Sequence, residues 1–169
     1  IEVINYLKNT GKEITLLSGD KKDIVSKTAK KLGISKYFSQ QDPIEKYKII
    51  QNLKNQSGAI MVGDGINDAA ALKMADVSIS PANASDISKN CSDLIFQGNK
   101  LSSIIKMLNI SQKSQKIIWQ NFALSFIYNI IIIPFAFFGF LSPFLAAFSM
   151  SLSSILVTLN SMRVNIKAK

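Results

Sequence analysis

The sequence predicts an α/β domain built on a parallel sheet, followed by two transmembrane α-helices. Three observations support this prediction. Short apolar runs alternate with helical patterns over the first hundred residues, a Gly-Asp-Gly loop follows one of these runs, and the 46 residues from Ile117 to Met162 include no Asp, Glu, Lys or Arg. The chain therefore divides into a charged soluble part and an apolar membrane part.

The soluble part alternates strands and helices along the chain. An amphipathic helix begins at residue 1 and ends near Gly11. Strands are then expected at residues 14–17, 37–38, 59–62, 76–79 and 93–96, and helices at residues 21–32, 44–55, 68–74 and 85–90. Because strand–helix–strand connections are right-handed, this order predicts a doubly wound parallel sheet with helices on both faces.

The loop after the third strand has the strongest functional signal, a string MVGDGINDAAAL that begins at residue 61. Gly63 and Gly65 let the backbone turn sharply and approach a ligand. Asp64 and Asp68, four residues apart, can direct two hard oxygen ligands to one point, as Mg2+ requires. We expect a magnesium-dependent phosphate site at this edge of the sheet. The alternative is an ordinary Gly-Asp turn with an aspartate near a helix N-terminus.

This string resembles the hinge motif of P-type ATPases, whose cytosolic phosphorylation domain belongs to the haloacid-dehalogenase superfamily. Two further elements of the family stand upstream in the same order, the Ser18-Gly19-Asp20 turn and the Pro43-Ile44-Glu45-Lys46 segment. The resemblance implies that Ser18 hydrogen-bonds the transferring phosphoryl group and that Lys46 neutralises the aspartyl phosphate. It also implies that Asp64 and Asp68 hold Mg2+ and that Asn67 orders the loop.

The sequence departs from the family pattern at two points. The family usually has proline where Ala70 stands, a change that removes no ligand. Its nucleophilic aspartate, in a DKTGT string, does not occur in this sequence. We therefore expect the chain to be the C-terminal part of a longer pump, inactive alone, with the nucleophile and most ATP contacts upstream. Residues 1–98 would belong to the phosphorylation domain, and residues 99–116 would form a helical connection to the membrane.

The uncharged stretch predicts a membrane hairpin. As helices, residues 117–138 span about 33 Å and residues 144–162 about 28 Å, so each can cross a hydrocarbon core of about 30 Å of a lipid bilayer. Residues 139–143 form the outer loop, which has no charge, whereas basic residues flank the other ends of both helices. Both ends, including the tail at residues 163–169, should therefore face the cytoplasm. We expect an integral protein of a bacterial inner membrane.

Polar residues inside the first span suggest a pathway for a transported ion. Tyr128 and Asn129 lie in mid-span, where polar groups are costly unless they face protein or a pathway. Pro134 cannot donate a hydrogen bond to the carbonyl of Ile130, which loosens the helix beside this pair.

In the second span, Met150, Ser153 and Ser154 share one helical face. A thioether suits Cu(I), and these spans offer no carboxylate or lysine for a harder ion. The alternative is that Met150 packs against lipid or a neighbour and that the serines mediate helix packing.

These membrane residues resemble the signatures of the copper-transporting subclass of heavy-metal P-type ATPases. The matching positions are Asn121, Tyr128-Asn129 and Met150-x-x-Ser153-Ser154. Zinc, cadmium and lead pumps have a lysine and an aspartate in these spans instead. Segments 77–82 and 120–124 resemble the branch that supplies copper for bacterial cytochrome oxidase assembly. The resemblance implies transported Cu(I) and partners such as a copper chaperone or oxidase assembly factors.

Composition and motifs also bear on the other classes of function. The net charge of +9 could suggest nucleic acid, but many lysines flank the membrane helices and no aromatic-basic platform occurs, so we expect no nucleic-acid partner. Cys91 is expected to be a packing residue, because the chain has no histidine to join it as a metal ligand. A non-catalytic remnant or split subunit of a pump would share the soluble motifs, as would a membrane-anchored haloacid-dehalogenase phosphatase.

Overall fold

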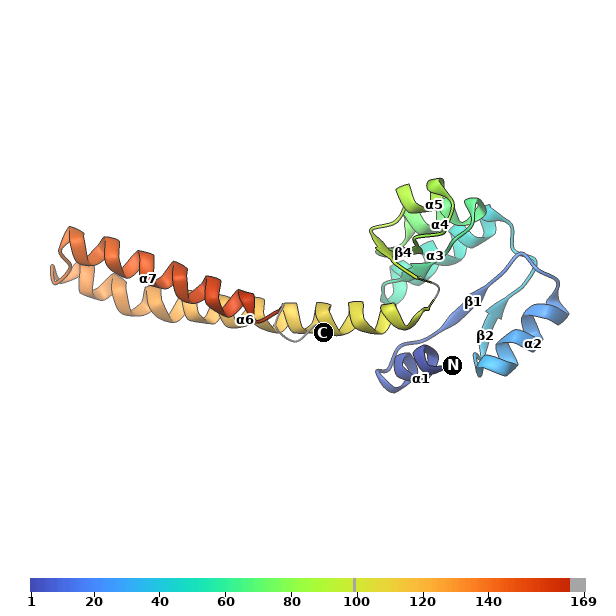
Figure 1. Ribbon diagram of the computed structural model, residues 1–169, viewed down its shortest axis with the longest axis horizontal. Helices are drawn as coiled ribbons and strands as arrows, with labels where there is room; N and C mark the ends of the chain where they lie inside the picture. Colours follow the sequence, from blue (N-terminus) through green and yellow to red (C-terminus); the bar gives the residue numbers. More distant parts are fainter. Residues whose placement is uncertain (99, 165–169) are drawn as a thin grey trace. The chain divides into compact units, whose positions relative to one another are not determined.

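The computed structural model describes residues 1–98 and 100–164 (Figure 1). The chain divides into two compact units, Ile1–Ile105 and Lys106–Lys169. The first unit contains the alternating strands and helices, and the second contains most of two long helices. Residues 165–169 of the expected cytosolic tail lie outside the described residues.

The first unit has the expected alternating order of elements. In chain order these are α1 (Glu2–Asn9), β1 (Thr15–Leu17), α2 (Lys22–Leu32), β2 (Lys36–Phe38), α3 (Pro43–Ser57), β3 (Ile60–Val62), the 3-10 helix η1 (Ile66–Asp68), α4 (Ala69–Met74), β4 (Val77–Pro81), α5 (Asp86–Asn90) and β5 (Leu94–Phe96). Every strand pair is parallel, which confirms the α/β prediction. The helix expected at residues 68–74 is split, because a turn of 3-10 helix precedes α4.

The strands form two sheets rather than the single sheet that the sequence pattern suggested. One sheet pairs β1 with β2, and the other has the order β3-β4-β5. Leu16 lies opposite Tyr37 in the first sheet, and Met61 lies opposite Ser78 in the second. Apolar runs predict where strands occur but not which edges pair. Among the described residues, β1 and β3 are not hydrogen-bonded neighbours.

Helix α3 begins with a capping box. The Asp42 side chain accepts a hydrogen bond from the Glu45 N–H at 2.7 Å, and the Glu45 carboxylate accepts one from the Asp42 N–H at 2.9 Å. Pro43 occupies the first helical turn, where its missing N–H has no cost. The cap fixes where α3 starts and therefore which way Lys46, in the same first turn, can reach.

The core of the three-stranded sheet lies between α3, α4 and β3. It consists of the buried side chains of Ile50, Met61, Ala71, Leu72 and Ala75. Fully burying a side chain such as Leu72 stabilises the fold by about 1.5–3 kcal/mol. This packing holds the first turn of α3 close to the loop that follows β3, which is the region of the candidate site.

A buried serine lowers the pKa of Asp93, which immediately precedes the outer strand β5. Ser78 donates from its hydroxyl and its backbone N–H to Asp93 Oδ2, both at 2.8 Å. These bonds, the hydroxyl's first, hold the pKa of Asp93 below its ordinary value. The ionised carboxylate therefore favours the folded state above the ordinary aspartate pKa, and this contribution is lost as pH falls through the lowered pKa.

Ser78→Ala should raise the pKa of Asp93 toward its ordinary value, because the variant removes the hydroxyl donor and keeps the backbone donor. An NMR titration of the Asp93 carboxyl carbon in both proteins measures the difference. An equal pKa in the two proteins would contradict this assignment of the cause.

The second unit is dominated by α6 (Ser102–Phe137) and α7 (Pro143–Met162). Both are long and apolar enough to cross a membrane. Almost none of their most apolar stretches is buried within the chain, unlike the core helix of a soluble protein. Helix α6 continues through Pro134, and α7 begins at Pro143 after an N-cap by Ser142. These features agree with the predicted membrane hairpin.

A cluster of amides joins α6 to α7. Asn160 Nδ2 donates to Asn121 Oδ1 at 2.8 Å, and Asn121 Nδ2 donates to Ser161 Oγ at 2.8 Å. Arg163 donates to the other polar atom of Asn160, Oδ1, at 2.9 Å. Asn121 is thus engaged in helix pairing, because hydrogen bonds between apolar helices fix their register.

Candidate functional site

The loop after β3 is shaped by two glycines. A Cβ atom on Gly63 would lie 3.0 Å from Asp68 Cβ, closer than side chains tolerate without a shift. The Gly65 N–H points to Asp68 Oδ2 at 3.4 Å, a long hydrogen bond. Glycine at position 63 therefore lets the loop fold back on Asp68, the residue that ends η1.

Lys46 and Asp68 form an ion pair at the centre of the site. Lys46 Nζ lies 2.7 Å from Asp68 Oδ1, and the two side chains are only 11% and 15% exposed. The residues are 22 positions apart and come from α3 and from the loop after β3. The structure thus brings together two residues that the family resemblance placed in one site. Their charges offset each other in a partly desolvated setting.

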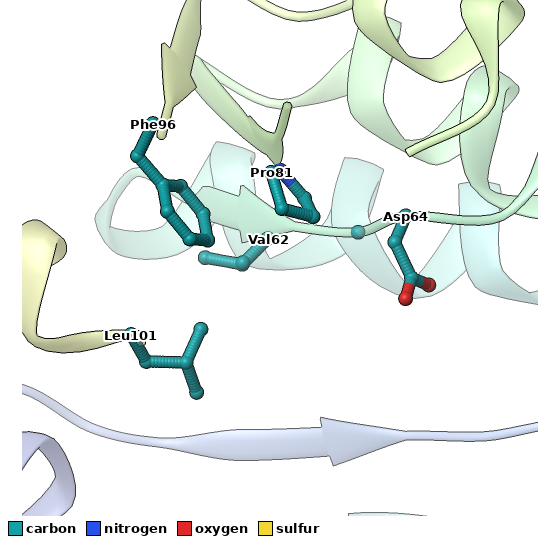
Figure 2. A pocket seen from close by; sticks show the side chains of 6 residues that line it. Val62, Asp64, Pro81, Phe96 and Leu101 are labelled. Carbon is teal, nitrogen blue, oxygen red and sulfur yellow. The ribbon is translucent and has the colours of Figure 1, made fainter. Parts of the chain in front are cut away.

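Asp64 projects from the same loop into a more open setting. Its side chain is exposed, and it makes none of the ion pairs found among the described residues. It borders an open pocket of about 230 Å³, whose other lining residues are Val62, Gly63, Pro81, Phe96 and Leu101. Figure 2 shows the Asp64 carboxylate beside these apolar side chains and directed away from Phe96. An exposed carboxylate next to a buried ion pair leaves one anionic group available for a cation.

Ser18 and Asp20 lie after β1, in the other sheet. Ser18 Oγ donates to Asp20 Oδ2 at 3.1 Å, and the Asp20 N–H donates to Ser18 Oγ at 3.1 Å. Within the described residues, Ser18 makes no hydrogen bond to Lys46 or to the loop after β3. Asn67 lies in η1 with an exposed side chain. The structure therefore assembles Lys46, Asp68 and the glycines, and it leaves Ser18 and Asn67 outside this contact.

The carboxylates of the loop fit a magnesium ion that would also bind a phosphate group. Asp64 and Asp68 offer only hard oxygen atoms. No group of three or more His, Cys, Asp or Glu that could hold a metal occurs among the described residues. Mg2+ keeps several waters and is commonly held by one or two carboxylates together with substrate phosphates. Two carboxylates on one loop are thus a sufficient protein contribution.

The candidate copper residues differ in their exposure within the chain. Tyr128 and Ser153 are half-buried, whereas Asn129, Met150 and Ser154 are exposed. Met150 is 71% exposed, and its backbone carbonyl accepts a hydrogen bond from Ser154 Oγ at 3.2 Å.

Two fully buried serines that the sequence analysis did not identify contact the glycine loop. Ser80 Oγ donates to the Gly63 carbonyl at 2.7 Å, and Ser88 Oγ donates to the Gly65 carbonyl at 2.5 Å. The sequence offered one signal for them, namely hydroxyl groups within an otherwise apolar strand and a short helix. Buried polar groups of this kind are normally hydrogen-bonded, so each was expected to have a partner.

Comparison with known proteins first identifies the class of fold. Residues 1–76 match the family model described as haloacid dehalogenase-like hydrolase. This agrees with the parallel strands, the Gly-Asp-Gly loop and the Lys46–Asp68 pair. The chain therefore has a haloacid-dehalogenase-like fold joined to two long apolar helices.

More specific relatives match nearly the whole chain. Nitrogen fixation protein FixI of Rhizobium leguminosarum bv. viciae is 40% identical over 97% of this chain and 22% of its own length. A copper-transporting ATPase of Helicobacter pylori is 41% identical over 99% of this chain and 24% of its own length. The chain is a homologue of both proteins and spans about a quarter of their length.

The structural comparison agrees with the sequence relatives. A zinc-transporting PIB-type ATPase in the E2.Pi state matches 96% of this chain and 27% of its own chain, with a TM-score of 0.87 and 25% identity. The predicted resemblance to heavy-metal P-type ATPases is thus confirmed. The shared fold does not distinguish copper from zinc, which depends on the side chains within the membrane.

Proposed function

We propose that this chain forms part of the phosphorylation domain and two membrane helices of an ATP-driven pump that translocates Cu(I). The observation that carries the proposal is the Lys46–Asp68 ion pair of 2.7 Å beside the Gly63–Gly65 loop. It occurs in a chain that is homologous along almost its entire length to copper-transporting ATPases. Both ends of the chain would face the cytoplasm, and the membrane would be the inner membrane of a bacterium.

The soluble site would stabilise charge on a phosphoryl group rather than attack it. Asp64 and Asp68 would hold Mg2+, which neutralises phosphoryl oxygens when bound. Lys46 supplies a fixed positive charge at the same place, and Ser18 would donate a hydrogen bond to the phosphoryl group. A nucleophilic aspartate from a segment outside this sequence would accept the phosphoryl group from ATP, and water would later hydrolyse the acyl phosphate.

The membrane part would provide half of a copper site. Met150 supplies a thioether, and Tyr128, Asn129, Ser153 and Ser154 supply oxygen atoms. The exposed position of Met150 and Asn129 leaves them available to further membrane helices of a complete pump. The absence of any charged residue from 117 to 162 favours a soft monovalent ion over zinc. A copper chaperone or oxidase assembly factors would be partners of the complete protein.

A chimera tests this proposal. It replaces the matching segment of the Helicobacter pylori copper-transporting ATPase with this chain, which aligns over 99% of its length. We expect the chimera to form an acid-stable, hydroxylamine-sensitive phosphoenzyme from 32P-labelled ATP, with turnover stimulated by Cu(I). The isolated chain should incorporate no label, because its sequence has no DKTGT string to supply the nucleophile.

The unmodified Helicobacter ATPase is the control for the chimera. Labelling of the isolated chain would show that it has its own nucleophile and would contradict the proposal. A membrane-inserted chimera that takes no label, beside a control that does, would contradict the assigned role of the soluble site. Stimulation by zinc instead of copper would overturn the assignment of the transported ion alone.

A further inference from the structure

Three consecutive carbonyl groups of the glycine loop are each held by a serine. The Gly63 carbonyl accepts from the Ser80 hydroxyl at 2.7 Å, and the Gly65 carbonyl accepts from the Ser88 hydroxyl at 2.5 Å. Between them, the Asp64 carbonyl accepts from the Ser85 N–H at 3.1 Å. The backbone on both sides of Asp64 is therefore fixed from β4 and α5.

Pro81 explains why Gly63 needs a side-chain donor. The Gly63 N–H donates to the Ile79 carbonyl at 3.1 Å, which continues the parallel β3–β4 ladder. In a parallel ladder, the Gly63 carbonyl would next accept from the N–H of residue 81. Residue 81 is proline and has no N–H. The Ser80 hydroxyl supplies the donor that the strand cannot.

Each of the two hydroxyls is backed by a second serine. Ser85 Oγ donates to Ser88 Oγ at 2.9 Å, so that the Ser88 proton is free for Gly65. Ser92 Oγ lies 2.6 Å from Ser80 Oγ. Ser92 Oγ also donates to the Ser88 carbonyl at 2.7 Å, so Ser92 contacts both buried serines.

We propose that Ser80 and Ser88 are positioning residues that present the Asp64 and Asp68 carboxylates to a magnesium ion. This inference rests on the proposed function of the site. Both serines are fully buried, so water cannot replace a lost hydroxyl at either carbonyl. A carbonyl without a donor turns toward other partners, which rotates the peptide planes on either side of Asp64. Groups that orient metal ligands in this way change metal affinity by about 10–100-fold.

The test uses the whole chain in lipid nanodiscs, labelled with 15N-glycine, so that its eight glycines give the amide signals. A titration with MgCl2 is followed at Gly63 and Gly65. We expect Ser80→Ala and Ser88→Ala each to raise the magnesium midpoint by about tenfold. Hydrogen exchange at the Gly63 amide should also become faster in Ser80→Ala, because the end of the ladder loses its anchor.

Two further variants separate positioning from general stability. Ser78→Ala removes an equally buried hydroxyl that bonds Asp93 and not the loop, so it should lower the melting temperature without moving the magnesium midpoint. Pro81→Ala gives residue 81 an N–H facing the Gly63 carbonyl. The double variant Ser80→Ala/Pro81→Ala should therefore return the midpoint to within about twofold of the original.

The outcomes distinguish this inference from the proposed function. The positioning role would be overturned if the folded variants Ser80→Ala and Ser88→Ala kept the original magnesium midpoint and the original rate of hydrogen exchange at the Gly63 amide. The same rise in midpoint in Ser78→Ala, or no rescue by Pro81→Ala, would also overturn it, because the effect would then be one of stability. An original chain without any magnesium response would contradict the proposed site, while Gly63 exchange would still test the anchoring of the loop.

Discussion

Asp64→Asn and Asp68→Asn should each lower the ATP turnover of the chimera by at least about 100-fold, the loss typical of removing one fixed charge-stabilising group from a catalytic site. Asparagine keeps the size of the side chain and removes its negative charge. Both variants therefore weaken the hold on Mg2+ where phosphoryl charge must be neutralised. Steady-state turnover at saturating ATP, measured over a range of magnesium concentrations, gives the effect.

The two variants should differ in stability. Asp64 is exposed, and its replacement should leave the melting temperature almost unchanged. Asp68 is the partner of Lys46, and both side chains are largely buried. Removing one member of a buried ion pair costs about 3–5 kcal/mol, because the other charge is left without compensation. Asp68→Asn should therefore lower the melting temperature of the isolated chain as well as turnover of the chimera.

Asp86→Asn is the matched control. Asp86 lies at the start of α5 and pairs with Lys89 on the surface, outside the glycine loop. It should retain both turnover and stability, since exposed ion pairs contribute little. Near-normal magnesium-dependent turnover in Asp64→Asn would remove this residue from the site. Equal stability of Asp68→Asn and the original chain would contradict the energetic importance of its pair with Lys46.

Local sequence signals predicted most element positions, because each depends on neighbouring residues. The apolar run before the glycine loop became β3, and the uncharged stretch became α7 and most of α6. Even the start of α3 was available in the sequence, since aspartate, proline and glutamate stand at the N-cap, first and third positions. The helix predicted at residues 44–55 nevertheless starts one residue later than α3, which begins at Pro43.

Features that depend on long-range pairing could not be read in the same way. The division of the strands into two sheets depends on which edges meet, and apolar patterns do not specify this. The amide contact between Asn121 and Asn160 joins residues 39 positions apart. The need for the Ser80 hydroxyl depends on the strand register, which places Pro81 opposite the Gly63 carbonyl. Only the fold shows that the ladder lacks a donor there.

The candidate site shows the same limit. The family resemblance implied separate roles for the two residues. Lys46 would neutralise the aspartyl phosphate, and Asp68 would bind magnesium. The structure adds that they bind each other at 2.7 Å. The Lys46 ammonium and a magnesium ion would therefore compete for one carboxylate, or share its two oxygen atoms. Asp64 has no such partner among the described ion pairs, so its carboxylate is more available to magnesium than that of Asp68.

Met150→Leu should abolish most of the copper response of the chimera while its fold persists. Leucine conserves volume and apolar character, and such exchanges usually cost less than about 1.5 kcal/mol. Met150 is 71% exposed, so little packing within this chain depends on it. If its thioether binds Cu(I), the loss removes the main soft ligand of these two helices. We expect Cu(I)-stimulated turnover to fall by at least about tenfold, since even groups that only orient a ligand have effects of that size.

Met162→Leu is the control, because Met162 lies on the same helix, is also exposed and stands outside the M-x-x-S-S segment. It should retain copper stimulation. Ser154→Ala separates the two interpretations further, because it removes a hydroxyl that donates to the Met150 carbonyl within the helix. A copper role predicts reduced stimulation at an unchanged melting temperature, whereas a packing role predicts the reverse. Intact copper stimulation in Met150→Leu would remove the thioether from the pathway and leave a heavy-metal pump whose ion is selected elsewhere.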